Sequence, residues 1–273
     1  MFDKRRIGTL LLCCLFVLLL ATGCGTDTKT EYAQTTGPAS TYLVEYIPGM
    51  MSAAEGKTTF DLRIMKRSDG SLVTNLTSTG LSIAPRMYMN NGKNHATPTA
   101  AIANNNDGTY TCTVYYLMAS AMSGSMGPMP MGHWELAVSI GTEKTSFYPY
   151  VKMAMGSNTP KVTLKGQADS ISSMTGTEKR SYYLFRDAVT TGATSTFTVF
   201  VAAKESMDNY PAVTAGAILT SPSGTWVVSS PTTTLQASTD LATWIPGTDN
   251  GAGIWTVAGL SGISSSGTST VYV

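Results

Sequence analysis

The sequence predicts an all-β protein made of two β-sandwich domains, and three observations support this fold class. Apolar and polar residues alternate in many short runs, and such alternation turns one set of side chains toward a buried face. Turn signals rich in Gly, Asn, Asp and Pro separate these runs. After the N-terminal apolar segment no long stretch has the apolar period of a helix, and many short strands at this spacing are typical of sandwiches.

The N-terminus has the parts of an export signal. Residues 4–6 are basic, and an apolar run follows over residues 10–20. The run is shorter than the roughly 20 apolar residues that span a bilayer, so it suits a cleavable signal. The run ends in Ala-Thr-Gly-Cys at residues 21–24, where small residues precede a cysteine. This segment resembles a bacterial lipobox, although Ala21 stands where Leu is most frequent.

The lipobox resemblance implies that residues 1–23 are a signal peptide and that Cys24 is the lipidated first residue of the mature chain. A diacylglyceryl thioether and an acylated amine would supply several acyl chains, each worth about 0.8 kcal/mol per buried methylene. We therefore expect a protein anchored to a membrane of the cell envelope. Gly25 stands where an Asp would retain enteric lipoproteins in the inner membrane, which favours the outer membrane. The alternatives are an uncleaved anchor and an ordinary secretory signal with a chance cysteine.

The rest of the chain divides into a tether and two predicted domains. Residues 24–40 are rich in Thr, Gly, Ser and Ala and have few apolar side chains, so they are predicted to be a flexible tether. The predicted sandwiches cover residues 41–156 and 157–273. The clearest alternating runs lie at residues 60–64, 110–114, 134–140 and 197–201.

A faint internal repeat supports the division into two domains. Residues 106–114 resemble residues 249–257, because each stretch is a turn that leads into an alternating strand. Residues 58–62 likewise resemble residues 195–199. Self-similarity of this kind indicates two copies of one supersecondary unit. The alternative is that antiparallel strands resemble one another without any repeat.

Composition excludes several classes of partner and crosslink. Charged residues make up 13% of the 273 residues, and the net charge is +1. The predicted signal carries the surplus, so the mature chain is close to neutral and has no basic excess to attract nucleic acid. Cys13 and Cys14 leave with the signal and Cys24 is lipidated. Only Cys112 remains, which rules out an intramolecular disulfide. Cys112 lies two residues after Tyr110 in an alternating run, so it is predicted to face the core as a small buried residue.

Methionine and histidine are concentrated in one part of the chain. Of the 15 methionines, nine lie between Met87 and Met155, and the only two histidines, His95 and His133, lie in the same window. His133 has the opposite parity to Trp134, and His95 follows an Asn-Asn-Gly turn signal. Both histidines are therefore expected to be exposed.

In this window the sequence resembles the YtkA-like/FixH-like family of exported immunoglobulin-like domains. The resemblance covers residues 56–141. It rests on Gly-x-x-x-Phe-x-Leu at residues 56–62, Asp69-Gly70, Met87 and Met89 with the downstream His95, Gly-Thr-Tyr at 108–110, and Met-Gly-His-Trp-Glu-Leu-Ala-Val at 131–138. It implies an immunoglobulin-like sandwich and a suspected role in copper handling. An inserted Ser/Gly/Met loop at 119–130 and the Met-poor second domain depart from the family.

Cu(I) is the cofactor that suits this set of side chains. Thioethers are soft ligands without a proton to lose, and copper binds them together with imidazole. A flexible loop could gather such ligands around one ion. The predicted metal ligands are Met87, Met89, His95, Met126, Met129, Met131 and His133.

Two other readings of the methionines stay open. Methionine fills irregular gaps in cores, and Met118, Met122, Met126 and Met129 are spaced like one face of a helix, although the prolines and glycines between them disfavour a long helix. Met153 and Met155 share the parity of Val151 and are expected to lie in the core.

Exposed methionines could also form an adaptable surface for another protein. The alternative function is therefore an adhesion or envelope-assembly module whose loop contacts a partner protein and binds no metal. No nucleophile motif, phosphate loop or zinc pattern accompanies the two histidines, so we expect no catalysis.

Overall fold

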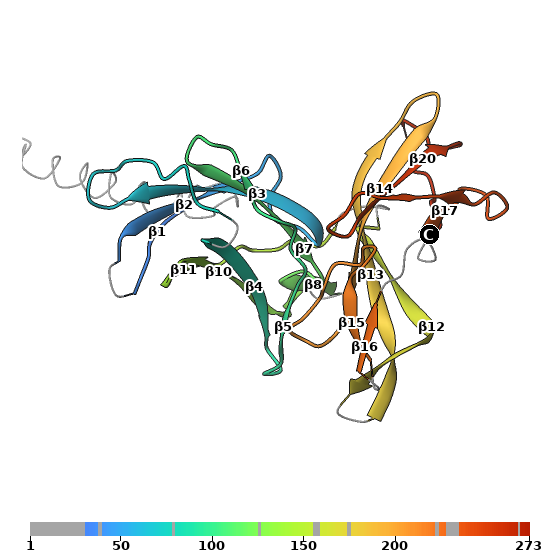
Figure 1. The fold of residues 1–273 in the computed structure, drawn as a ribbon, viewed down its shortest axis with the longest axis horizontal. Coiled ribbons are helices and arrows are strands. Elements are labelled where there is room, and N and C mark those ends of the chain that lie inside the picture. Colours follow the sequence, from blue (N-terminus) through green and yellow to red (C-terminus); the bar gives the residue numbers. More distant parts are fainter. Residues whose placement is uncertain are drawn as a thin grey trace, which may run out of the picture.

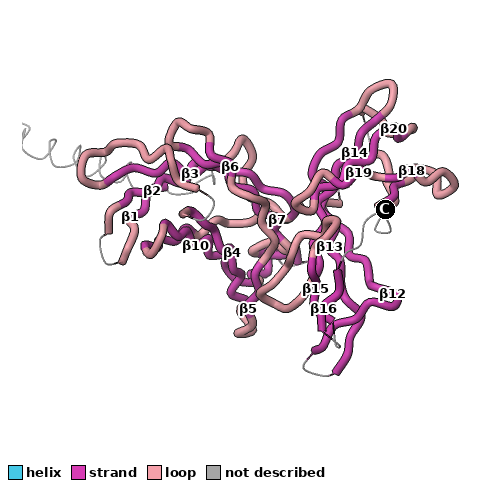
Figure 2. Tube along the Cα trace, in the orientation of Figure 1, coloured by secondary structure: helices cyan, strands magenta, loops and turns pink. Residues whose placement is uncertain are grey.

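The structure, a computed structural model, confirms the all-β class. It describes residues 31–37, 40–77, 80–124, 127–154, 159–173, 176–221, 224–227, 235–266 and 268–273. Within these ranges every regular element is a strand, as Figure 2 shows by its colours. No helix there has the length and apolar character needed to span a membrane. The signal peptide and Cys24 lie outside the described residues.

The N-terminal half contains two antiparallel sheets (Figure 1). The first has the strand order β1-β2-β3-β7-β6, and the second has the order β11-β10-β4-β5. The strands of the first sheet are β1 (Glu31–Gln34), β2 (Tyr42–Pro48), β3 (Gly56–Lys66), β7 (Thr109–Tyr116) and β6 (Ala103–Asn104). Those of the second are β11 (Glu143–Phe147), β10 (Gly132–Ile140), β4 (Leu81–Met89) and β5 (Asn94–Ala96). A separate hairpin pairs β8 (Ala121–Gly124) with β9 (Gly127–Pro130).

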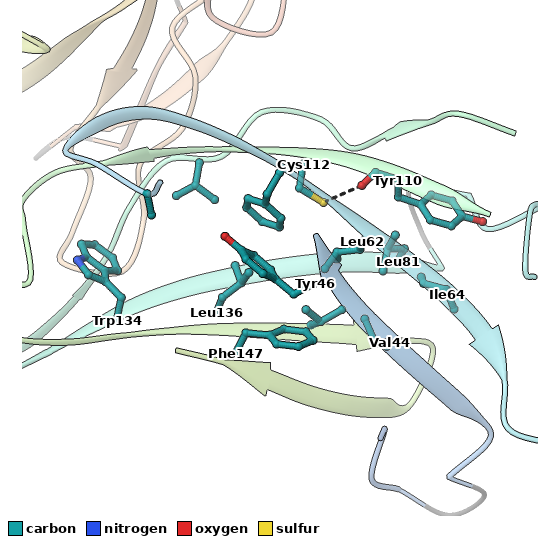
Figure 3. Packing of buried hydrophobic residues seen from close by; sticks show 14 of the residues in the cluster. Val44, Tyr46, Leu62, Ile64, Leu81, Tyr110, Cys112, Trp134, Leu136 and Phe147 are labelled. Carbon is teal, nitrogen blue, oxygen red and sulfur yellow. Dashed lines mark hydrogen bonds between the residues drawn. The ribbon is translucent and has the colours of Figure 1, made fainter. Parts of the chain in front are cut away.

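The two sheets enclose one apolar core, seen from close by in Figure 3. Alternating residues of β3 and β10 are buried, as the period of two predicted. Leu62 from β3 and Leu136 from β10 are both fully buried. Cys112 is fully buried too, and burial raises the pKa of its thiol to about 12. The expectation of an inert core cysteine at this position is confirmed.

The segment predicted to be a tether is partly ordered. Strand β1 pairs with β2 over its full length, and the Thr35 Oγ1 hydroxyl donates a 2.5 Å hydrogen bond to Glu143 Oε2. Desolvation alone would raise the pKa of Glu143, but hydrogen bonds from Thr35 and Thr41 outweigh it and hold the pKa below its ordinary value. Polar composition failed as a guide here, because an edge strand is held by backbone hydrogen bonds and needs few apolar side chains.

The C-terminal half is built on one five-stranded antiparallel sheet of order β12-β13-β14-β20-β19. Among the described residues of this half, two small hairpins and the C-terminal segment pack beside the sheet, and no second extended sheet is present. The sheet strands are β12 (Lys161–Ser173), β13 (Gly176–Thr190), β14 (Ser195–Ala203), β20 (Ile254–Leu260) and β19 (Thr248–Asp249). The hairpins are β15 (Ile218–Ser221) with β16 (Gly224–Val227), and β17 (Gln236–Ala237) with β18 (Ile245–Pro246).

The strands of the suspected repeat pair with each other in both halves. In the N-terminal half Phe60 on β3 is the register partner of Cys112 on β7. In the C-terminal half β14 pairs with β20 in the same antiparallel sense, and Phe197 is opposite Val257. An exact repeat would place Trp255 opposite Phe197, so the pairing in the C-terminal half is shifted by two residues along β20. The proposed boundary at 156–157 falls within residues 155–158, which lie outside the described residues.

The two halves meet through an aromatic and ionic contact. The ring of Tyr115 on β7 stacks on Phe200 of β14 with centroids 4.0 Å apart and planes 4° from parallel. The Tyr115 hydroxyl donates a 2.7 Å hydrogen bond to Asp187, which also pairs with Lys57 at 2.8 Å. A second contact lies at β5, where the Ala96 N–H donates a 2.8 Å bond to the carbonyl of Met207. The C-terminal half therefore covers the free edge of β5.

Candidate soft-metal site

His95 is a buried residue on the inner face of the second sheet. It lies in the middle of β5 and is the register partner of Met87, which is the register partner of Trp134 on β10. All three are buried, with His95 only 5% exposed. The expectation of an exposed His95 was wrong. The turn before it is followed at once by a short strand, whose pairing with β4 turns the imidazole toward the core.

The imidazole of His95 faces a thioether. His95 Nε2 lies 3.2 Å from the Sδ atom of Met118, and Nδ1 lies 2.8 Å from the carbonyl oxygen of Ala96. The ring also meets Trp134 edge to face, with centroids 5.5 Å apart. Trp134 in turn donates its indole N–H to the carbonyl of Met118 at 3.1 Å. The indole thus positions both members of the pair.

The protonation state of His95 follows from these contacts. Burial lowers its pKa, and the positive charges of Lys204 and Arg86 act in the same direction, while the Ala96 carbonyl and Asp208 oppose them. The ring is therefore neutral at pH 7 and carries one proton. Because the Ala96 carbonyl only accepts, the proton belongs on Nδ1. The unprotonated Nε2 then points its lone pair at a sulfur that has no hydrogen to donate.

Two more predicted ligands pack against the same core as Met118. Met89 and Met131 are partly buried and pack against the same N-terminal core as Met118. Met89 is the register partner of Gly132, where a Cβ atom would lie only 2.1 Å from a backbone oxygen. Glycine at this position therefore lets β10 approach β4 closely and brings the Met131 backbone next to the end of β4.

His133 belongs to the other face of the sheet. It is the register partner of Tyr88, and the two rings stack with centroids 5.3 Å apart. His133 is exposed, as its parity predicted. For the same reason it does not join His95, because adjacent residues of a strand point to opposite faces.

The seven predicted ligands therefore do not form one site. Met129 lies on the β8–β9 hairpin and is 56% exposed, and Met126 lies outside the described residues. Met87, Met89, His95 and Met131 lie at or against the inner face, while His133 lies on the outer face. Among the described residues, His, Cys, Asp and Glu side chains do not gather in any group of three that could hold a metal.

Met118 is the neighbour of the His95 imidazole that sequence reasoning missed. Its spacing from Met122 and Met129 suggested one face of a helix, and this hid its separate position before the hairpin. Pro128 and Pro130 carried the better signal. Two prolines at alternate positions suit a strand whose missing N–H groups would point away from its partner. They therefore indicate the β8–β9 hairpin, which begins at Ala121 and leaves Met118 outside it.

Comparison of the chain with protein-family models gave no match, and comparison with curated proteins gave none either. The resemblance to YtkA-like/FixH-like domains therefore stays a prediction from short motifs.

Proposed function

We propose that the chain is a non-catalytic lipoprotein of the cell envelope that binds Cu(I) through His95 and Met118. The main observation in favour of this proposal is that an imidazole nitrogen of His95 lies 3.2 Å from the thioether sulfur of Met118. With Nδ1–H held by the Ala96 carbonyl, both atoms present lone pairs to the same point. A soft cation between them converts a repulsive contact into two bonds.

The distance between the two atoms is close to what a shared ion requires. Metal ions bind imidazole nitrogen at about 2.0 Å and sulfur at about 2.3 Å, which implies a nitrogen–sulfur separation of roughly 3.5 Å. A small rotation of the Met118 side chain supplies the difference, because methionine has three rotatable bonds. Met87 is the register partner of His95 and lies on the same inner face, so its thioether is the nearest candidate in the sheet for a third ligand.

The lowered pKa of His95 reduces the competition between a proton and a metal ion for its Nε2 atom. A lowered pKa means that His95 releases its second proton more readily than a solvated histidine. Metal binding to imidazole competes with that proton. Copper bound at His95 should therefore meet less competition from protons as the pH falls than copper bound at a solvated histidine.

The test is an anaerobic titration of the chain from residue 25 to 273 with Cu(I), against a competing chelator of known affinity. Met118→Leu roughly conserves volume and removes only the sulfur. We expect this substitution and His95→Gln each to abolish the tightest binding event. His133→Ala is the matched control and should leave it unchanged. Equal affinity of the wild type and Met118→Leu would refute the site.

The anchoring part of the proposal rests on the lipobox at residues 21–24 and is tested separately. Cys24→Ala should move the protein from the membrane fraction to the soluble envelope fraction. Mass spectrometry of the wild-type N-terminus should find acyl chains on Cys24, whereas an unmodified N-terminal cysteine would contradict the lipoprotein assignment.

A further inference from the structure

The β8–β9 hairpin presents methionines to solvent in a fixed arrangement. Its register pairs Ala121 with Pro130, Met122 with Met129 and Ser123 with Pro128. Prolines donate no N–H, so the two proline positions are the ones whose backbone groups point away from the partner strand. The pairing of β8 with β9 therefore tolerates two prolines in four residues. This pairing places Met122 and Met129 opposite each other.

Met122 and Met129 form a cross-strand pair. Directly opposed residues of an antiparallel pair share one face, with Cβ atoms about 5 Å apart. The two side chains are 45% and 56% exposed. A Cβ atom at Gly124 would lie 3.1 Å from Cγ and 3.5 Å from Sδ of Met129. The Met129 side chain therefore lies across Gly124, along the surface of the hairpin.

A third thioether meets the hairpin at its edge. The Ser123 N–H donates to Met153 Sδ at 3.2 Å. This sulfur therefore lies against β8 at a point between Met122 and the turn of the hairpin. Met153 is 37% exposed, and the expectation that it lies in the core was wrong. Met155, which was expected to lie in the core together with Met153, lies outside the described residues. The loop after β11 thus brings a distant part of the sequence to Met122 and Met129.

The chemistry of this surface is that of a soft-ligand site. Residues 118–132 contain no charged side chain, so hard cations find no carboxylate there. The three sulfur atoms are uncharged, unprotonated and accessible, which are the properties that select Cu(I) among the biological first-row metals.

We infer that Met122, Met129 and Met153 form a second Cu(I) site on the surface, which receives the ion and passes it to His95 and Met118. This inference rests on the proposed function of the buried pair. The hairpin is flanked in sequence by Met118 before it and Met131 after it, and both pack against the N-terminal core. Met118 and Met131 are therefore the thioethers that connect the hairpin to the core along the chain, and the Met131 N–H donates a 2.8 Å bond to the carbonyl of Ser120 beside the start of β8.

The experiment measures copper stoichiometry and loading rate on the chain from residue 25 to 273. The variant replaces Met122, Met129 and Met153 together with Leu. We expect the wild type to bind two Cu(I) ions and this variant to bind one, with slower filling of the buried site followed by Trp134 fluorescence. The matched control replaces Met50 and Met51 with Leu, since both are more exposed, at 105% and 82%, and lie in a different loop.

The outcomes separate the two proposals. A wild type that binds one ion, lost in Met118→Leu, would overturn the surface site and leave the buried site standing. A wild type that binds no copper would overturn both. Two ions in the triple variant, or the same loss in the Met50 and Met51 control, would show that the hairpin methionines are not specific ligands and would also overturn the inference.

Discussion

The two halves of the molecule enclose their cores in different ways. In the N-terminal half two sheets face each other, and their inner faces are filled by apolar residues such as Leu62 and Leu136. In the C-terminal half one sheet carries the core, and its covering segments leave a cavity of about 500 Å³ lined in part by Leu184, Phe197 and Val271. Both halves also bury polar side chains: Glu45, His95 and Glu143 are buried in the N-terminal half, and a fully buried arginine lies in the C-terminal half.

The polar group buried in the C-terminal half is a guanidinium. Arg180 is fully buried, and its Nε donates to Asp169 at 2.7 Å. Its other nitrogens donate to Glu205 and to the carbonyl of Thr220. The hydroxyl of Tyr182 also donates to Asp169. One cation thus ties β13 to β12, to the loop after β14 and to the β15–β16 hairpin.

The largest expected effect tests this contrast directly. Arg180→Met should lower the free energy of unfolding by about 3–5 kcal/mol, because it leaves two carboxylates without their buried cation. Urea denaturation measures the change. Adding Asp169→Asn and Glu205→Gln should recover a large part of it. A loss below about 1 kcal/mol would mean that water already solvates the network.

In the N-terminal half a large effect is expected from an apolar truncation. Leu136→Ala should cost about 2–5 kcal/mol, since the residue is fully buried between the two sheets. Leu164→Ala is the matched control, because Leu164 lies on β12 and is 42% exposed. Its expected cost is within about 0.5 kcal/mol. Similar losses in the two variants would contradict the closed core.

A smaller effect of opposite sign is expected at Tyr116. Its hydroxyl is buried without a hydrogen-bond partner in the described part of the chain, and burial raises its pKa. Tyr116→Phe removes an unsatisfied polar atom and should stabilise the protein by about 1 kcal/mol. Thermal denaturation at neutral pH measures this gain. A loss of stability would indicate that the hydroxyl has a hydrogen-bond partner and that its surroundings are less apolar than described.

The smallest effect concerns acid stability. The folded state lowers the pKa of His95, so below a pH of about 6.5 the unfolded chain binds more protons than the folded one. Stability contributed by neutral His95 is therefore present above that pH and lost as pH falls. His95→Gln should flatten the stability profile below about pH 6.5. An unchanged profile would show that the imidazole is solvated.

The sequence predicted what depends on local alternation and missed what depends on pairing. The period of two correctly placed Leu136 and Cys112 inside and His133 outside, because each lies within a long strand. His95 and Met153 were misplaced, since a short strand and a loop take their orientation from the strand on which they pack. The site shows the same division. The methionine-rich window was visible in the sequence, but the meeting of His95 with Met118 depends on β5 pairing with β4.

The docking of β1 on β2 sets a limit on where the protein can work. If Cys24 carries lipid as proposed, only seven peptide units separate it from Glu31, the first residue of β1. At about 3.6 Å each they reach roughly 25 Å. This linker is then shorter than the N-terminal sandwich, so the sandwich stays beside the lipid headgroups. Copper donors or acceptors would have to meet it at the membrane surface.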